Sequence, residues 1–197
     1  MAGLLIAFEG LDQSGKQTQA ELLRDYLTSR SRSCRLMSFP DYATAIGNEL
    51  SRALHGAREY PPDVMQLLYV ANRYEHRDEI LKWLSDDGVI VCDRYMASSI
   101  AYGEAQGLDP VWLADIQRFL PAPDLTIVLD IAPETAVQRK AAGRDRYERD
   151  LALLGRVRQS YQRQAADPRW RVLDGERSKS EIATAVVEAV AKALSRQ

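Results

Sequence analysis

Five short runs of hydrophobic residues stand out along the chain. Most of them are rich in Val, Ile and Leu and show no strict alternation of apolar and polar positions. This pattern is typical of strands that are covered on both faces, as in a parallel sheet. We therefore predict five strands, at Leu4–Phe8, Cys34–Phe39, Val89–Asp93, Leu125–Asp130 and Trp170–Asp174.

Segments with helical periodicity lie between these runs. A longer helix is predicted from Asp63 to Leu84, because Pro61 and Pro62 precede it and Asp63 is a suitable N-cap. The segment 16–29 has the hydrophobic spacing of an amphipathic helix, carried by Leu22, Leu23, Tyr26 and Leu27.

The second half of the chain continues this alternation. Asp109 followed by Pro110 predicts a capped helix that runs to Leu120, and Pro133 begins another helix after the fourth strand. The last helix has one apolar face, made by Ile182, Val186, Val190 and Leu194. Strands that alternate with helices predict a doubly wound α/β fold, here one domain over residues 1–197.

The composition is that of a packed soluble domain. Hydrophobic residues make up 46% of the chain and charged residues 27%, so a core is expected and disorder is not. The net charge of −2 leaves no basic footprint for nucleic acid, although a local basic cluster would suffice for a free nucleotide. Leu4–Phe8 is too short for a signal-peptide core, and no run has the length of a membrane helix. We expect no membrane association and a cytoplasmic location.

The cysteines and histidines predict no metal centre. Cys34 and Cys92 lie in apolar, strand-like runs, where buried free thiols are expected. His55 and His76 are isolated from each other and from the cysteines, so no zinc spacing is present.

The segment FEGLDQSGKQTQ has the spacing of a phosphate-binding loop. Gly10 precedes Gly15-Lys16 by four intervening residues, after an apolar strand and before an amphipathic helix. Backbone N–H groups in such a loop bind phosphate, and the helix N-terminus adds a positive dipole. The alternative is a glycine turn with a surface lysine. Gln17 stands where a Walker A motif has Ser or Thr for magnesium, and Thr18 comes one residue late, so a carboxamide oxygen or a water would fill that place.

Two other segments carry side chains suited to a nucleotide. Asp93 and Arg94 follow a buried strand, at the edge where open α/β sheets bind ligands, and the arginine offers bidentate donors to a phosphate. A salt bridge at a strand end is the alternative. Tyr69 and Arg73 share a helix face, although such pairs are common on helices. The densely charged segment 141–150, AAGRDRYERD, is on composition alone either a solvated loop or a functional one.

Taken in order, these segments resemble the thymidylate kinase family. The resemblance is carried by FEGLD with GK and T, FPDY followed by AIG, ANRYE, DRYMASSIAY, PDLTIVLDI with PE, and the arginine-rich DRYE. It covers nearly the whole chain, and the DRY-x-x-S-x-x-x-Y and DLTIVLD–PE runs are its most specific parts. It implies a P-loop NTPase fold with a short LID at about 141–150. It also implies transfer of the γ-phosphoryl group of ATP to dTMP with Mg²⁺, in dTTP biosynthesis, by a homodimer.

The resemblance also implies roles for individual residues. ATP phosphates would be bound by Gly10, Leu11, Asp12, Gln13, Ser14, Gly15, Lys16, Gln17 and Thr18. The dTMP site would be formed by Phe39, Pro40, Tyr42, Tyr69, Arg73, Asp93, Arg94, Ser98, Ser99 and Tyr102. Catalysis would fall to Lys16, Arg94, Asp12 and the LID arginines Arg144, Arg146 and Arg149. Asp12 and Asp93 would face the metal, through water.

Within this pattern Tyr69 would stack on thymine, and Tyr102 would pack under the sugar and disfavour a 2′-hydroxyl. The loop LDQSGK has no arginine, so the catalytic arginine would come from the LID. Three positions depart from the pattern: Gln17, Tyr42 where some members have an arginine, and Ser99 where an amide would read thymine more strictly.

Three other functions remain open from the sequence. A kinase for UMP, CMP or AMP would share the fold but prefer a ribonucleotide. A deoxynucleoside kinase would need a carboxylate base near a 5′-hydroxyl, for which Glu9 is the candidate. A non-catalytic nucleotide-binding protein is supported only by Gln17.

Overall fold

The computed structural model describes residues 3–139 and 150–194 of the chain. Its centre is a sheet of five parallel strands in the order β2-β3-β1-β4-β5. The strands are β1 (Leu4–Gly10), β2 (Cys34–Ser38), β3 (Val89–Asp93), β4 (Leu125–Asp130) and β5 (Trp170–Asp174). The predicted five-stranded parallel sheet is confirmed, with bounds that differ from the prediction by at most two residues.

The central strands differ from the edge strands in burial. β1 is buried along its whole length, and β3 and β4 are buried except at their last residue. The edge strand β2 buries only Met37, and β5 has no fully buried residue, because each has a neighbour on one side only. Full coverage was therefore a wrong prediction for the two edges. For the same reason Cys34 is only half-buried, whereas Cys92 in β3 is buried, and both thiols are free.

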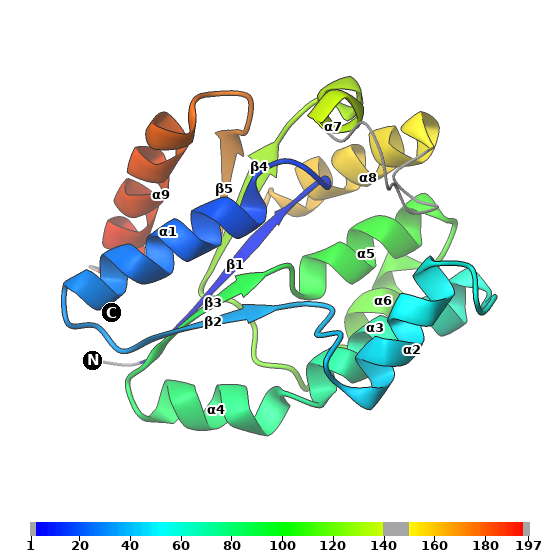
Figure 1. Ribbon diagram of the computed structural model, residues 1–197, viewed down its shortest axis with the longest axis horizontal. Helices are drawn as coiled ribbons and strands as arrows, with labels where there is room; N and C mark the ends of the chain where they lie inside the picture. Colours follow the sequence, from blue (N-terminus) through cyan, green and yellow to red (C-terminus); the bar gives the residue numbers. More distant parts are fainter. Residues whose placement is uncertain (1–2, 140–149, 195–197) are drawn as a thin grey trace.

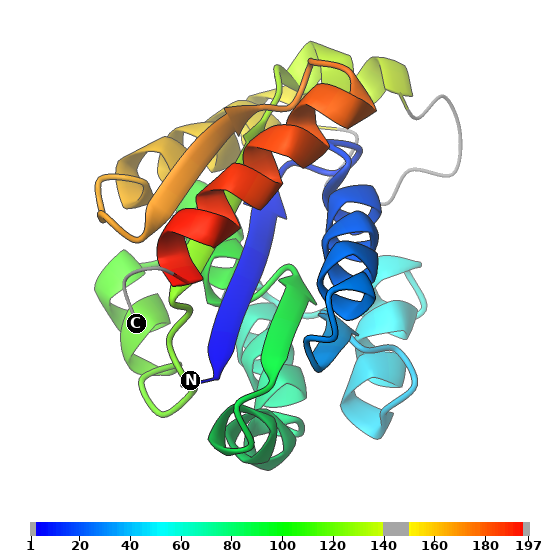
Figure 2. The same cartoon turned by 90° about the vertical axis from the view of Figure 1, so that its left-hand side faces the viewer.

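Helices cover both faces of the sheet (Figures 1 and 2). On one face α1 (Lys16–Ser29) and α9 (Lys179–Leu194) pack on Leu4, Ile6 and Phe8 of β1. Leu5 and Ala7 alternate with these residues and point into a second cluster, with Ile80 of α4 (Arg77–Ser85). This alternation along a strand buried on both sides builds two cores from one run of apolar residues.

The other helices are α2 (Ala45–Leu54), α3 (Pro62–Tyr74), α4 (Arg77–Ser85), α5 (Met96–Ala105), α6 (Pro110–Asp115), α7 (Pro133–Arg139) and α8 (Leu151–Gln164). The sequence analysis did not predict α2, α5 or α8. α8 does carry a periodic apolar face with Leu154, Val157 and Tyr161. α5 lacks such a signal, because it is made largely of small residues that are buried from several sides.

The predicted helix 63–84 is in fact two helices. The chain turns between α3 and α4, where the carboxylate of Glu75 accepts hydrogen bonds from Thr44 Oγ1 at 2.7 Å and Asn72 Nδ2 at 3.0 Å. The ring of His76 packs edge-on against Phe39, with the ring centroids 5.5 Å apart. These contacts with the segment after β2 divide the predicted helix into two.

Two helix ends also differ from the prediction. Pro61 occupies the N-cap position of α3 and Pro62 begins the helix, so Asp63 lies in the first turn instead of capping it. The Asp109 cap of α6 is confirmed, since its side chain accepts from the Val111 N–H at 2.9 Å. That helix ends at Asp115, and a series of turns leads on to Leu120.

Within the described residues, no helix is both long and apolar enough to cross a membrane.

Candidate active site

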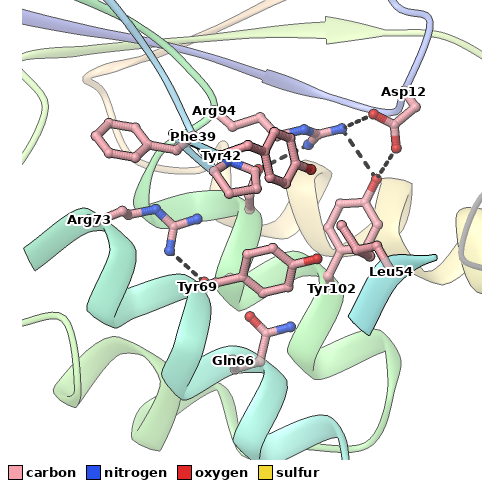
Figure 3. A pocket seen from close by; sticks show the side chains of 12 residues that line it. Asp12, Phe39, Tyr42, Leu54, Gln66, Tyr69, Arg73, Arg94 and Tyr102 are labelled. Carbon is pink, nitrogen blue, oxygen red and sulfur yellow. Dashed lines mark hydrogen bonds and ion pairs between the residues drawn. The ribbon is translucent and has the colours of Figure 1, made fainter. Parts of the chain in front are cut away.

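A pocket opens at the carboxyl ends of β1 and β3, next to the predicted phosphate loop (Figure 3). Twelve residues line it: Asp12, Phe39, Pro40, Tyr42, Leu54, Gln66, Tyr69, Arg73, Arg94, Ser98, Ser99 and Tyr102. The structure thus brings together ten of the residues named from the sequence. Leu54 and Gln66 were missed, and Asp93 is not part of the lining.

The loop after β1 has the backbone of an anion-binding turn. Gly10 has a φ of 133°, and a Cβ there would lie 2.5 Å from the carbonyl oxygen of Leu129. Gly15, with a φ of 92°, is the N-cap of α1. Both conformations favour glycine, which explains why the loop is bounded by these two residues. The first turn of α1 leaves its N–H groups directed at the loop, where an anion would be stabilised.

Lys16 is the first residue of α1 and is only 6% exposed. Its Nζ donates to the carbonyl oxygen of Leu11 at 2.7 Å, which folds the side chain back along the loop. Burial, with the charge of Arg94 in addition, lowers the pKa of Lys16 to about 8, although Asp12 and Asp93 act in the opposite direction. The ammonium group is thus a poorly solvated charge held beside the loop.

Arg94 is the centre of a hydrogen-bond network at the top of the pocket. One terminal nitrogen donates to the carbonyl oxygen of Gly10 at 3.1 Å and to Ser98 Oγ at 3.0 Å. The other donates to Asp12 Oδ1 at 2.7 Å, and Tyr102 donates to Asp12 Oδ2 at 3.2 Å. Burial alone would raise the pKa of Asp12, but Arg94 and then Lys16 hold it well below its ordinary value. The carboxylate and the guanidinium therefore form a stable ion pair.

Glu9, the last residue but one of β1, lies under this network and is fully buried. It accepts from the backbone N–H of Tyr95 at 2.8 Å, from Ser98 Oγ at 2.6 Å and from the Tyr161 hydroxyl at 3.0 Å. Both carboxylate oxygens are thus engaged, and Glu9 does not line the pocket. A role as a general base, which the deoxynucleoside kinase hypothesis requires, has no support in this geometry.

The opposite end of the pocket is formed by one face of α3. Arg73 is 3% exposed and donates from one terminal nitrogen to Ser99 Oγ at 2.7 Å and to Gln117 Oε1 at 3.4 Å. Its Nε has no hydrogen-bond partner among the described residues. Tyr69 lies one turn before Arg73, and its ring borders the space between Arg73 and Tyr102 (Figure 3).

The segment after β2 forms another wall and is fastened to α3 by Asn72. The backbone N–H of Asp41 donates to Asn72 Oδ1 at 2.8 Å, and Asn72 Nδ2 donates to Thr44 Oγ1 at 2.9 Å. Phe39 is buried, whereas Tyr42 is 49% exposed at the rim. Asn72 is fully buried and was not named from the sequence, because its role depends on a segment about 30 positions away.

Asp93 and Gln17 are the side chains that bear on a metal ion. Asp93 Oδ1 is buried without a hydrogen-bond partner among the described residues, and burial, with Glu9 and Asp12 nearby, raises the pKa of its carboxyl group. Gln17 is exposed, and its Nε2 donates to Glu21 Oε1 at 2.9 Å on the surface of α1. The described residues contain no group of three or more His, Cys, Asp or Glu that would hold a metal alone.

The LID arginines Arg144, Arg146 and Arg149 lie outside the described residues. The description resumes at Asp150, which caps α8 by accepting from the Leu153 N–H at 2.9 Å. α8 then carries Tyr161 into the site, where its hydroxyl contacts Glu9, Ser98 and Arg94. Tyr161 was also missed, although its place on the apolar face of a periodic segment was visible in the sequence.

The geometry agrees with the comparisons to known proteins. A family model described as thymidylate kinase matches residues 8–186. Thymidylate kinase of Dictyostelium discoideum is 35% identical over 93% of this chain and 83% of its own length. That of Schizosaccharomyces pombe is 39% identical over 82% of this chain and 76% of its own length. The solved structure of thymidylate kinase from Candida albicans superimposes with a TM-score of 0.83 and 31% identity, covering 97% of this chain and 92% of that one.

Proposed function

The chain belongs to the thymidylate kinase family, and we propose that it transfers the γ-phosphoryl group of ATP to dTMP, giving dTDP and ADP in dTTP biosynthesis. One observation supports this most directly. A loop with the backbone of a phosphate-binding turn and a buried lysine adjoins a pocket whose far end presents an aromatic ring and a guanidinium. The two parts meet at Asp12 and Arg94.

For the acceptor, we propose that the phosphate of dTMP binds near Arg94 and the base near Tyr69 and Arg73. Arg94 offers several N–H donors in a fixed plane, which suits a phosphate. The face of Tyr69 suits a planar base, and the guanidinium of Arg73, which also lines the pocket, can donate to a ring carbonyl. Tyr102, hydrogen-bonded to Asp12 between the two ends, is proposed to lie against the sugar.

For the donor, we propose that residues 10–18 bind the ATP phosphates. The left-handed glycines and the start of α1 support this assignment. Lys16 is proposed to neutralise charge on the transferred phosphoryl group, and its poor solvation strengthens that interaction. The LID arginines, with the LID at about 141–150 of a single kinase domain, remain a prediction from the sequence.

The mechanism that we propose needs no general base. Phosphoryl transfer has a loose transition state, so alignment and charge stabilisation supply most of the acceleration. The acceptor is a phosphate with a second pKa near 6 and is already largely ionised at neutral pH. The role of the chain is then to hold the two nucleotides in line, with Lys16 and Arg94 beside the charge that moves.

We propose that Mg²⁺ binds with the nucleotides and that Asp93 contacts it through water. When bound, the ion would neutralise phosphate charge. The buried, unpartnered oxygen of Asp93 fits this role. Asp12 fits it less well, because both of its oxygens are taken by Arg94 and Tyr102. Gln17 is directed at Glu21, so a water is the better candidate for the position usually held by Ser or Thr.

The assembly and the location are also proposals. Exposed apolar side chains at Leu67 in α3, Val111 in α6 and the following Phe119 favour a homodimer. Two free thiols suit a reducing compartment such as the cytoplasm.

The test is ADP release from ATP and Mg²⁺ with dTMP, dUMP, UMP, CMP or AMP as acceptor. We expect dTMP to exceed the others in kcat/KM. A preference for a ribonucleotide would overturn the acceptor assignment and leave the fold intact. No release with any acceptor would overturn the proposed activity.

A further inference from the structure

Gln66 is the polar residue of the pocket whose position calls for an explanation. It lies in α3 and is 1% exposed, yet neither Nε2 nor Oε1 has a hydrogen-bond partner among the described residues. A buried carboxamide without partners is unfavourable, because it loses its hydrogen bonds to water and gains none. Gln66 nevertheless belongs to the lining of the pocket, so a bound molecule is a source of the partners that its two buried polar atoms lack.

The surroundings hold the side chain in place. Gln66 is one helical turn before Tyr69 and two turns before Arg73, and all three lie on the face of α3 that lines the pocket. Its Cγ packs against Gly103 of α5, where an added Cβ would lie only 3.3 Å away. In Figure 3 the carboxamide lies beside the ring of Tyr69, within the group of residues proposed to bind the acceptor.

Arg73 provides a second unpartnered group on the same face. Its Nε is buried and unpaired, like the carboxamide of Gln66. Along α3, Tyr69 lies between Gln66 and Arg73. A flat molecule on the ring of Tyr69 would therefore meet a donor from Arg73 at one part of its edge. It would meet both a donor and an acceptor from Gln66 at another.

We propose that Gln66 is a base-reading residue of the acceptor pocket. Its Oε1 accepts from N3–H of thymine and its Nε2 donates to an adjacent ring carbonyl. The inference rests on the proposed binding of dTMP in this pocket. A thymine or uracil ring has a donor flanked by two acceptors, which complements the carboxamide and leaves a second carbonyl for Arg73.

Gln66 and Arg73 together explain how cytosine is rejected. When Gln66 pairs with N3–H and the 2-carbonyl of thymine, the 4-carbonyl is left for Arg73. In cytosine an amino group replaces that carbonyl, so the guanidinium, which has donors only, would face another donor. N3 and the 2-carbonyl of cytosine are both acceptors, which one carboxamide cannot match in either orientation.

The experiment compares wild type with Gln66→Met, which has a similar volume and no hydrogen-bonding group. The dissociation constant for dTMP is measured by calorimetry, and the unfolding temperature is measured without ligand. We expect affinity for dTMP to fall about fivefold to tenfold. The unfolding temperature should rise by about 2–4 °C, because the unpartnered carboxamide is gone. A rise in stability with a loss of binding is not expected of a structural residue.

Gln164→Met is the matched control. Gln164 lies on α8 outside the pocket, and its Nε2 contacts the Ala97 carbonyl oxygen and Ser160 Oγ, each at 3.4 Å. The control should keep wild-type affinity for dTMP and show no rise in unfolding temperature. An unchanged dTMP affinity in Gln66→Met would overturn the proposal, whether the unfolding temperature rises or falls.

N3-methylated dTMP tests the assigned atoms. If Oε1 accepts from N3–H, the fivefold to tenfold ratio between variant and wild type should shrink to about one with this analogue. An undiminished ratio would overturn the assignment to the base edge. The two proposals fail differently: a wild-type protein that neither binds nor turns over dTMP refutes the proposed function. Normal turnover together with unaltered affinity in Gln66→Met refutes only the role of Gln66.

Discussion

The two ends of the pocket prepare for a ligand in opposite ways. At the phosphate end Arg94 and Asp12 are already bonded to each other, and Tyr102 and Ser98 complete the set. At the base end Gln66 and Arg73 Nε are buried without partners. At the phosphate end the polar side chains thus bond to one another. At the base end some polar atoms have no partner until a ligand supplies one.

The two buried arginines of the pocket are held differently. Arg94 is paired with the carboxylate of Asp12 before any substrate arrives, which offsets the cost of burying both charges. The guanidinium of Arg73 is held by the neutral oxygens of Ser99 and Gln117. A neutral carboxamide costs much less, and the fold can leave it unpaired. Strong charges held in fixed positions favour rate, and unpaired neutral groups favour selective binding. We therefore expect substitutions at the two ends to act on different kinetic quantities.

Lys16→Met breaks the phosphate end and should have the largest effect. Removing a poorly solvated charge beside the transferred phosphoryl group should lower kcat about 10²- to 10³-fold. The dissociation constant for dTMP should change less than about threefold, because Lys16 does not line the acceptor pocket. Steady-state kinetics and calorimetry measure the two quantities, with the exposed Lys82→Met as control. Wild-type turnover in Lys16→Met would contradict the phosphate-loop assignment.

Tyr69→Ala breaks the base end. Loss of an aromatic face under a base weakens binding by about 1–3 kcal/mol, so the dissociation constant for dTMP should rise about tenfold to a hundredfold. kcat at saturating dTMP should change much less. Tyr69→Phe keeps the ring and should retain affinity within about twofold. A loss confined to kcat in Tyr69→Ala would show that the two ends are not separable in this way.

The pH dependence of kcat/KM and of the free energy of unfolding tests the role assigned to Lys16 at the phosphate end. The folded pKa of about 8 lies below the ordinary value of 10.5, so the amine of the free enzyme loses its charge as the pH rises through 8. kcat/KM for ATP should fall up to about tenfold per pH unit above that point. Stability should move the other way. Between pH 8 and 10.5 the unfolded state binds more protons than the folded state, so the free energy of unfolding rises with pH.

Denaturant titrations across this range measure the stability, and initial rates measure kcat/KM. In Lys16→Met the rise in stability should be absent, since the titrating group is gone. If it persists in the variant, another group is responsible.

Gln17→Ser should have the smallest effect. The Gln17 side chain is exposed and bonded to Glu21, so it is not directed at the phosphates. We expect kcat and the Mg²⁺ concentration for half-maximal rate to stay within about twofold of wild type. A large gain in Mg²⁺ affinity would mean that the water proposed for that position is a poor substitute.

Much of the fold was predictable because its signals are local. Val, Ile and Leu runs marked the strands, and the loop between Gly10 and Lys16 followed from its spacing and from the apolar strand and amphipathic helix beside it. The break between α3 and α4 was not predictable, since Glu75 and His76 turn there to meet Phe39 and Thr44, which are distant in sequence. The spacing of apolar residues along a segment does not report contacts with residues that are distant in sequence.

Some candidate residues carry a local signal in the sequence. Asp93 and Arg94 stand at the end of a buried strand, and Tyr69 and Arg73 share a helix face. The pocket brings Arg94, Tyr69 and Arg73 together, and their roles stay predictions. Gln66 was missed because a glutamine in a helix has no distinctive pattern, and only burial without a partner reveals it. The LID arginines remain a prediction, since they lie outside the described residues.

The contacts of Glu9 also constrain when the site can form during synthesis. This carboxylate is joined to Tyr95, Ser98 and Tyr161, which follow it by 86, 89 and 152 positions. A nascent chain that has not yet exposed α8 lacks one of the hydroxyl groups that donate to Glu9, and Arg94 lacks the same hydroxyl as an acceptor. Glu9 and Arg94 therefore gain this contact only after the ribosome has released the chain as far as Tyr161.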